Sequence, residues 1–245
     1  MIPKRLIQLW LTPEDAATCQ KPPLKLLHRK CQQSLLKLHP DFEYCFFSNE
    51  DCVEFMKEKW PGFLPLWHHY PRPVQRADFF RVLALYELGG FYFDLDIYFH
   101  EPIHALTKHN LVFPAEWVMP EDLYQRRHRE PLQRRKDLHQ VGNYAFGAAP
   151  KHWFLRELLE EMIRRTNEVD MQNLTDADVL FTTGPDMVNA VARRFPNELA
   201  KEMVRLKGEP SPRKPVAVVQ WGKKEWFQFG KYGNHLMSSA WRRDE

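Results

Sequence analysis

Two aspartates, Asp94 and Asp96, stand near the end of the aromatic run 89–99 (GGFYFDLDIYF), with one leucine between them. In extended backbone, residues two apart point to the same face, so both carboxylates can project together while Leu95 turns into the core. Two ionised carboxylates side by side repel each other, and a divalent cation would remove that repulsion. Carboxylates suit Mg²⁺ or Mn²⁺, which complete their shells with phosphate oxygens and water. The pair predicts a metal clamp for a diphosphate, although Asp-x-Asp is also common in polar turns.

A second pair of charges, Asp78 and Arg81, interrupts the otherwise apolar segment 76–88 (RADFFRVLALYEL). Residues three apart share one face of a helix, so this pair is either a structural ion pair or part of a binding site. An aspartate here can accept a hydrogen bond from a ribose hydroxyl, and an arginine can pair with phosphate in a planar fork. Tyr92, two residues before Asp94, is expected on the side of the metal pair.

The elements that must position these residues alternate along the first part of the chain. We expect a strand over 5–11, a helix over 24–38, a strand over 42–48, a helix from the N-cap Ser48 to Trp60, a buried helix over 76–88 and a strand over 91–93. Gly89-Gly90 ends the buried helix. This alternation favours a parallel sheet with helices on its faces, and such sheets bind ligands at the carboxyl ends of their strands.

The second half of the chain continues the same pattern. We expect strands over 110–114, 143–148 and 216–219, a helix over 153–166, a helix that starts within 182–186, and an irregular tail. Asp186, in the first turn of that last helix, either stabilises the helix end or supports the site. The 245 residues show no internal repeat and no low-complexity linker, so we expect one domain over 1–245.

Charge and composition limit the partners and the compartment. A net charge of +3 does not indicate a nucleic-acid-binding protein. The spacing of the four cysteines fits neither a metal site nor a disulfide framework. The chain has no secretory signal and no apolar stretch long enough for a bilayer, so we expect the cytoplasm. The basic segment from Arg126 to Lys136 (RRHREPLQRRK) is either a solvated loop or a peripheral contact with anionic acceptors or the inner face of a membrane.

The run 76–96 (RADFFRVLALYELGGFYFDLD) resembles the signature of glycosyltransferase family 32, the DXD-containing sugar transferases that include initiating α-1,6-mannosyltransferases. It is more distantly similar to the catalytic domains of the large clostridial glucosylating toxins. Four further segments resemble the family in the same order: IPKRLIQLW, VGNYAFGAAPKHWF, TTGP and HLMSSAW. The resemblance implies a GT-A fold, that is, a Rossmann-like, mostly parallel central α/β sheet with helices on both faces. It also implies a nucleotide-sugar donor, a cofactor Mn²⁺ or Mg²⁺ and retention of the anomeric configuration.

The resemblance assigns roles to individual residues on the donor side. Leu9 and Trp10 would line the pocket of the base, and Gln8 beside them would also bind substrate. Asp78 would hold the sugar or ribose. Asn143 would face the donor sugar near the acceptor, although it can also be a plain strand-end amide.

Other residues would act on the diphosphate and the metal. By the same resemblance, Arg81 and Tyr92 would contact the donor sugar and phosphate, Asp96 would bind the metal directly, and Asp94 would reach ribose or metal partly through water. Ser239 and Trp241 would close over the diphosphate, unless Trp241 only docks the tail. His235 would be a metal or phosphate ligand, and Ser239 would also bind the metal. Two departures stand out: Ile7 replaces a frequent histidine, and Leu236 replaces an acidic ligand of the toxins.

These observations predict a metal-dependent retaining glycosyltransferase that moves a hexose from a UDP-sugar or GDP-mannose to a hydroxyl of a surface polysaccharide or glycolipid intermediate. A toxin-like enzyme that modifies a host protein is an alternative. A haloacid-dehalogenase-like phosphatase fits less well, because its Asp-x-Asp lies near the N-terminus and is accompanied by a late acidic pair. A glycoside hydrolase would need two carboxylates that flank the sugar, and a sugar-binding module would need no metal.

Overall fold

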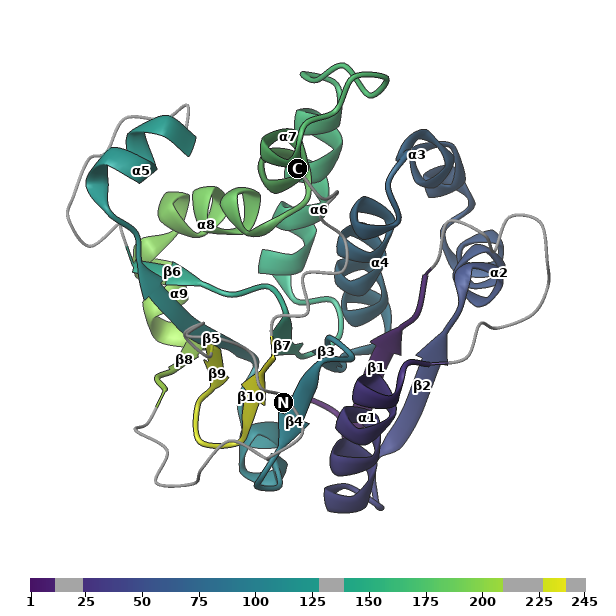
Figure 1. The fold of residues 1–245 in the computed structure, drawn as a ribbon, viewed down its shortest axis with the longest axis vertical. Helices are drawn as coiled ribbons and strands as arrows, with labels where there is room; N and C mark the ends of the chain where they lie inside the picture. Colours follow the sequence, from purple (N-terminus) through teal and green to yellow (C-terminus); the bar gives the residue numbers. More distant parts are fainter. Residues whose placement is uncertain (12–23, 128–138, 209–226, 237–245) are drawn as a thin grey trace.

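The structure is a computed structural model that describes residues 1–11, 24–127, 139–208 and 227–236 (Figure 1). The strand expected over 216–219 lies outside these residues. Among the helices described, none has both the length and the hydropathy required to cross a bilayer.

A seven-stranded sheet forms the centre of the described residues, in the order β2-β1-β3-β7-β5-β6 with β8 paired to β5. Its strands are β1 (Arg5–Leu9), β2 (Glu43–Phe47), β3 (Gly90–Phe93), β5 (Leu111–Val118), β6 (His139–Val141), β7 (Ala145–Ala148) and β8 (Met203–Leu206). β1 pairs in parallel with β2 and β3, β5 pairs in parallel with β8, and β7 runs antiparallel to β3 and β5. Only β6 and β7 run against the other five strands, so the predicted α/β class is confirmed.

A smaller sheet joins the end of the described chain to the strand that follows the two aspartates. β4 (Ile97–Phe99) pairs antiparallel with β10 (Gly233–His235), which pairs antiparallel with β9 (Phe227–Phe229). The yellow hairpin in Figure 1 therefore lies against β4. The expectation of an irregular tail is wrong for these residues, because neighbouring strand edges supply their backbone hydrogen bonds.

Helices cover both faces of the main sheet, as expected. α4 (Pro73–Leu88), α6 (Trp153–Thr166) and α8 (Pro185–Arg194) pack on one face, and α1 (Leu26–Leu38) packs on the other against β4. The strands alternate between these two cores. On β3, Tyr92 contributes to the core beneath α4, whereas Phe91 and Phe93 contribute to the core on the side of the small sheet.

Most predicted elements are present, with shifted ends. The Ser48 cap is confirmed as a capping box that opens α2 (Asn49–Lys59). β1 ends two residues before the predicted end, α4 starts three residues earlier, and Asn143 precedes β7 rather than opening it. The remaining helices were not anticipated: α3 (Leu64–His69), α5 (Glu121–Arg127), α7 (Asp176–Thr182), α9 (Pro196–Glu202) and the 3₁₀ turns Pro61–Phe63 and His104–Lys108.

The glycine pair between α4 and β3 determines the backbone path into the strand that precedes the two aspartates. Gly89 and Gly90 have φ values of 65° and 116°, which side-chain-bearing residues rarely adopt. A Cβ on Gly90 would also lie 2.7 Å from the backbone oxygen of Arg5 on β1. Glycine therefore lets the chain leave α4 and enter the sheet directly beside β1.

Candidate metal and donor site

Asp94 and Asp96 follow β3, and β10 brings His235 beside them. One potential ligand atom from each of these three residues lies within 4.8 Å of the others. The Nε2 atom of His235 lies 3.1 Å from Oδ1 of Asp96, and its ring stacks on Tyr144 with centroids 4.3 Å apart. Leu95 is buried as expected, but Asp96 is equally buried, and the two residues lie in a turn after β3 rather than in extended strand.

Burial and neighbouring charges shift the pKa values of this cluster. Burial raises the pKa of Asp94, and Asp96 acts in the same direction, while Arg81 opposes the shift. Burial would lower the pKa of His235, but its contact with Asp96 outweighs this effect and raises the pKa. Two carboxylates and an imidazole that converge in a partly buried place fit a divalent cation such as Mn²⁺.

Arg81 connects this cluster with the helix above it. Its guanidinium forms a buried ion pair with Asp78 on the same helix, α4. The Nη1 atom also lies 3.3 Å from Oδ1 of Asp94 and donates to the backbone oxygen of Asn143 at 2.8 Å. Tyr92 donates its hydroxyl to the same Asp94 oxygen at 2.5 Å. The structure thus brings Arg81, Tyr92 and Asp94 together from two elements.

Asp78 is the centre of a second group of polar contacts. Its Oδ1 atom accepts from the side-chain amide of Asn143 at 3.4 Å, and its Oδ2 atom accepts from the hydroxyl of Thr183 at 2.9 Å. Asp78, Arg81, Asn143 and Thr183 lie around the same closely packed gap, which is too small for a water molecule. Sequence analysis did not single out Thr183, although it belongs to the TTGP segment quoted for the resemblance.

The end of β1 separates the residues expected in the base pocket. Leu9 contributes to the core beneath α4, whereas Trp10 contacts the ring of His28 on α1, with centroids 5.1 Å apart. Gln8 is almost completely buried and accepts a hydrogen bond from the Tyr44 hydroxyl at 3.0 Å. The structure therefore does not place Leu9 and Trp10 on one wall. Ser239 and Trp241 lie outside the described residues.

Sequence analysis missed an acidic group close to this site, Glu116 on β5. Burial raises its pKa to about 7, while His235 and Arg127 act in the opposite direction and Asp186 adds to the rise. The strand was expected to end at residue 114, so no signal drew attention to Glu116. His28 was missed as well; burial lowers its pKa, and the charge of Asp96 opposes that shift.

Asp186 and the first residues of the basic segment pair with partners of their own. Arg127 binds Asp186 through two hydrogen bonds of 2.6 and 3.0 Å, and Arg126 pairs with the exposed Asp122. Asp186 is therefore more than a favourable charge at a helix start. The rest of the segment, 128–136, lies outside the described residues.

The sequence comparisons agree with the resemblance. Residues 27–113 match the family described as the glycosyltransferase sugar-binding region containing the DXD motif. Inositol phosphoceramide mannosyltransferase 2 of Schizosaccharomyces pombe is 29% identical over 199 residues, which are 81% of this chain and 48% of the relative. Inositol phosphoceramide mannosyltransferase 3 of the same organism is 32% identical over 184 residues, 75% of this chain and 43% of the relative. The chain thus spans less than half of the length of these relatives.

A solved structure supports the fold. The UDP-bound glycosyltransferase domain of the YGT toxin superposes with a TM-score of 0.55 at 7% identity, over 83% of this chain and 79% of that domain. At such low identity the likeness shows the fold alone. The predicted resemblance to DXD-containing and toxin-like glycosyltransferases is thereby confirmed. Asp94, Asp96, Arg81 and Asp78 lie within the residues 27–113 that match the sugar-binding region of the DXD glycosyltransferases.

Proposed function

We propose that this chain is the catalytic part of a metal-dependent, retaining glycosyltransferase that moves a mannosyl group from a nucleoside-diphosphate sugar to a hydroxyl of an inositol-containing glycolipid. One observation carries the proposal. Asp94, Asp96 and His235 converge within 4.8 Å, and both aspartates lie in the sequence region that matches the DXD sugar transferases. The mannosyl group and the lipid acceptor are supported by the names of the two relatives, both inositol phosphoceramide mannosyltransferases.

The proposed reaction needs charge stabilisation more than proton transfer. Mn²⁺ or Mg²⁺ held by Asp94, Asp96 and His235 would act as a Lewis acid that neutralises the charge on the departing diphosphate. The guanidinium of Arg81 adds a fixed positive charge beside Asp94, and such preorganised groups lower the barrier without reorganising. Tyr92 holds the Asp94 carboxylate in place through its hydroxyl.

The hexose is proposed to lie against Asp78 and Asn143. These side chains are hydrogen-bonded to each other and offer a carboxylate and an amide to sugar hydroxyls. In a retaining transfer, the acceptor hydroxyl attacks from the side of the leaving group. Its proton then passes to an oxygen of the departing phosphate, so the protein does not have to provide a general base.

The setting of the reaction is part of the same proposal. A lipid acceptor lies at a membrane surface, and we propose that the chain acts in the cytoplasm or as a peripheral protein at such a surface. The basic segment 126–136 supports this through its charge, since each basic residue near an anionic surface contributes about 1 kcal/mol.

The test is a binding and turnover panel with GDP-mannose, GDP, UDP-glucose and UDP, each with and without Mn²⁺. We expect Mn²⁺-dependent thermal stabilisation either by GDP-mannose and GDP or by UDP-glucose and UDP. The nucleotide sugar of that pair should release its nucleoside diphosphate only with Mn²⁺. Asp96→Asn should reduce the release by about 1000-fold, because single electrostatic contacts to the leaving group have effects of this order. Asp122→Asn, at an exposed aspartate of α5, is the matched control and should behave like the wild type.

The acceptor is tested with the same protein. Incorporation of labelled mannose into inositol phosphoceramide should exceed incorporation into a soluble polysaccharide or a protein fraction. Near-normal Mn²⁺-dependent turnover by Asp96→Asn would overturn the metal site, and preferred labelling of protein would favour the toxin-like alternative.

A further inference from the structure

The turn between α7 and α8 holds one oxygen of the Asp78 carboxylate. Thr183, which is fully buried, donates its hydroxyl to Oδ2 of Asp78 at 2.9 Å. The other oxygen, Oδ1, already pairs with Arg81 and accepts from Asn143. Thr183 therefore fixes the rotation of the carboxylate, because Oδ1 contacts alone would let the group turn about its own axis.

The shape of this turn is set by local packing. The backbone amides of Thr183 and Gly184 both donate to the oxygen of Val179, at 3.1 and 3.0 Å. A Cβ on Gly184 would lie 2.8 Å from the Cα atom of Leu180, so only glycine fits there without movement. The hydroxyl of Thr182 lies 3.3 Å from the side-chain nitrogen of Gln75, one turn before Asp78 on α4. The turn is thus attached to the helix that carries the site.

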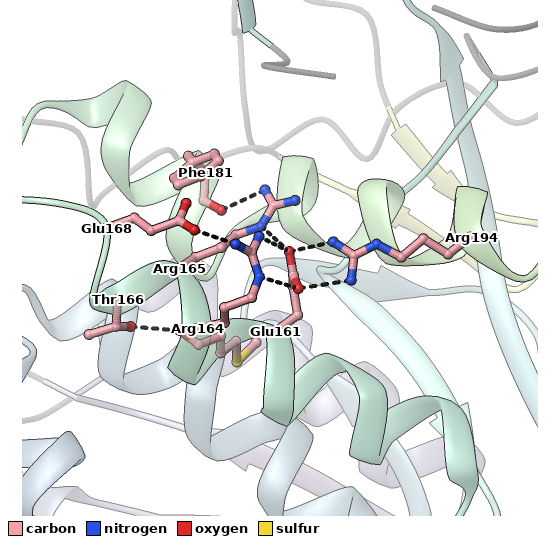
Figure 2. A network of polar contacts seen from close by, with 8 residues as sticks. Glu161, Arg164, Arg165, Thr166, Glu168, Phe181 and Arg194 are labelled. Carbon is pink, nitrogen blue, oxygen red and sulfur yellow. Dashed lines mark hydrogen bonds and ion pairs between the residues drawn. The ribbon is translucent and has the colours of Figure 1, made fainter. Parts of the chain in front are cut away.

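A buried ion pair is hydrogen-bonded to the end of α7, from which this turn leaves (Figure 2). Arg165 bonds Glu161 through Nε at 2.6 Å and donates from Nη1 to the backbone oxygen of Phe181 at 3.1 Å. Its guanidinium also lies 4.4 Å from the centroid of the Phe181 ring. Both Glu161 and Arg165 are almost completely buried. Phe181 precedes Thr183 by two residues, so Arg165 fixes the backbone that leads into the turn.

A buried pair of this kind is weak evidence for stability by itself, because desolvation opposes the attraction between the charges. The second hydrogen bond of Arg165, to the backbone oxygen of Phe181, links the pair to the end of α7. The contacts form a continuous path from Glu161 through Arg165, the backbone of Phe181 and the hydroxyl of Thr183 to Asp78.

We propose that Thr183 and Arg165 are positioning residues for the Asp78 carboxylate, and that they set the affinity for the hexose of the donor rather than for its nucleotide. This rests on the proposed function, in which Asp78 contacts the sugar. The distinction follows from the geometry, because Thr183 holds Oδ2 of Asp78, whereas the contact that leads on to Asp94 through Arg81 starts from Oδ1.

The first test uses Thr183→Val, which removes the hydroxyl at nearly equal volume, and Thr183→Ser, which keeps it. Dissociation constants are measured with Mn²⁺ for GDP-mannose and GDP, and in parallel for UDP-glucose and UDP. We expect Thr183→Val to weaken the nucleotide sugar by about 10- to 100-fold, as small displacements of positioned groups do, and to leave the nucleoside diphosphate unchanged. Thr183→Ser should restore most of the sugar affinity.

The second test uses two arginines that share Glu161. Arg165 reaches the Phe181 oxygen, whereas Arg164 pairs with Glu161 and Glu168 and is half exposed. Arg165→Lys loses the planar fork that serves two partners, so it should raise the KM for the nucleotide sugar by about 10-fold, the lower end of that range. Arg164→Lys is the matched control and should leave this KM unchanged.

The outcomes separate this inference from the proposed function. Two results for Thr183→Val would overturn the positioning role, provided that the wild type binds its donor. One is an equal loss of affinity for the nucleotide sugar and for the nucleoside diphosphate, and the other is an unchanged affinity for the nucleotide sugar. If the wild type binds neither pair of ligands with Mn²⁺, the proposed function itself fails. Should Arg165→Lys not fold, the two Thr183 variants still decide the question.

Discussion

Two acidic clusters, Glu161 on α6 and the pair Asp94 and Asp96 after β3, are balanced in different ways. Glu161 is surrounded by the guanidiniums of Arg164, Arg165 and Arg194 (Figure 2). Burial would raise its pKa, but the hydrogen bonds from Arg164, Arg194 and Arg165 outweigh burial and hold the pKa well below its usual range. At the other cluster, Asp94 faces Asp96, and burial raises its pKa in spite of Arg81.

The difference lies in which partner completes each cluster. The protein supplies more positive than negative charge around Glu161, so this carboxylate is stable as a structural anion. Among the described residues, Asp94 contacts Arg81 and Asp96 contacts His235, and burial together with the charge of Asp96 raises the pKa of Asp94 against the effect of both cations. A carboxylate pair in this condition gains most from a bound divalent cation, which distinguishes a binding site from a scaffold contact.

The largest expected effect on stability is at Glu161. Glu161→Ala leaves the buried Arg165 without its anion, and the loss of one partner from a buried pair destabilises by about 3–5 kcal/mol. Asp94→Asn, measured without metal, should change the free energy of unfolding by less than about 1 kcal/mol, because the repulsion by Asp96 disappears together with the contact to Arg81. Urea unfolding of both variants at pH 7 measures the difference.

Low pH should also remove the stability that the Glu161 cluster contributes. A carboxylate whose pKa is lowered by folding contributes stability above its unfolded pKa and loses that contribution as the pH falls. The wild type should therefore lose stability below about pH 4.5 more steeply than Glu161→Ala. Similar stabilities of Glu161→Ala and Asp94→Asn at pH 7 would contradict the distinction between the two clusters.

Glu116 resembles Asp94 in the direction of its pKa shift, and we expect a smaller effect on stability there than at Glu161. Its pKa is raised to about 7 by burial, so the folded protein binds more protons than the unfolded chain between about pH 4.5 and 7. Stability should fall as the pH rises through this range. Glu116→Gln should remove the fall and raise the free energy of unfolding at pH 8 by about 2 kcal/mol.

The measurement is a series of urea unfolding curves from pH 4.5 to 8, with a chelator present so that no metal occupies the neighbouring cluster. Parallel pH profiles of the wild type and Glu116→Gln would show that Glu116 is ionised in the folded protein, like Glu161.

The sequence could predict whatever depends on residues close together in the chain. The two-residue spacing of Asp94 and Asp96, the glycine pair after α4 and the Ser48 cap act within a few residues, and the structure shows each of them. The family resemblance added His235, which is distant in the chain, and the structure places it beside Asp96.

The features that were missed depend on pairing across the fold. Glu161 lies on an amphipathic helix, and nothing local distinguishes its buried carboxylate from the exposed acidic residues around it. Its partner Arg194 is 33 residues away, and Thr183 meets Asp78 over 105 residues. The hairpin of β9 and β10 pairs with the edge of β4, and Trp10, which follows β1, contacts His28 on α1 while Leu9 packs in the core.

The smallest expected effect on stability is at Arg164. It tests whether Glu161 remains ionised when one of its three arginines is removed. Its side chain is 50% exposed, and Glu161 keeps Arg165 and Arg194 when Arg164 is removed. Arg164→Ala should therefore destabilise by about 0.5 kcal/mol, as exposed ion pairs do, with an unchanged slope in urea unfolding. A loss above about 2 kcal/mol would mean that Glu161 needs all three guanidiniums to remain ionised, since only buried and uncompensated charges have effects of that size. The Glu161 cluster would then have no more positive charge than it needs. Charge balance would no longer distinguish this structural cluster from the binding site at Asp94 and Asp96.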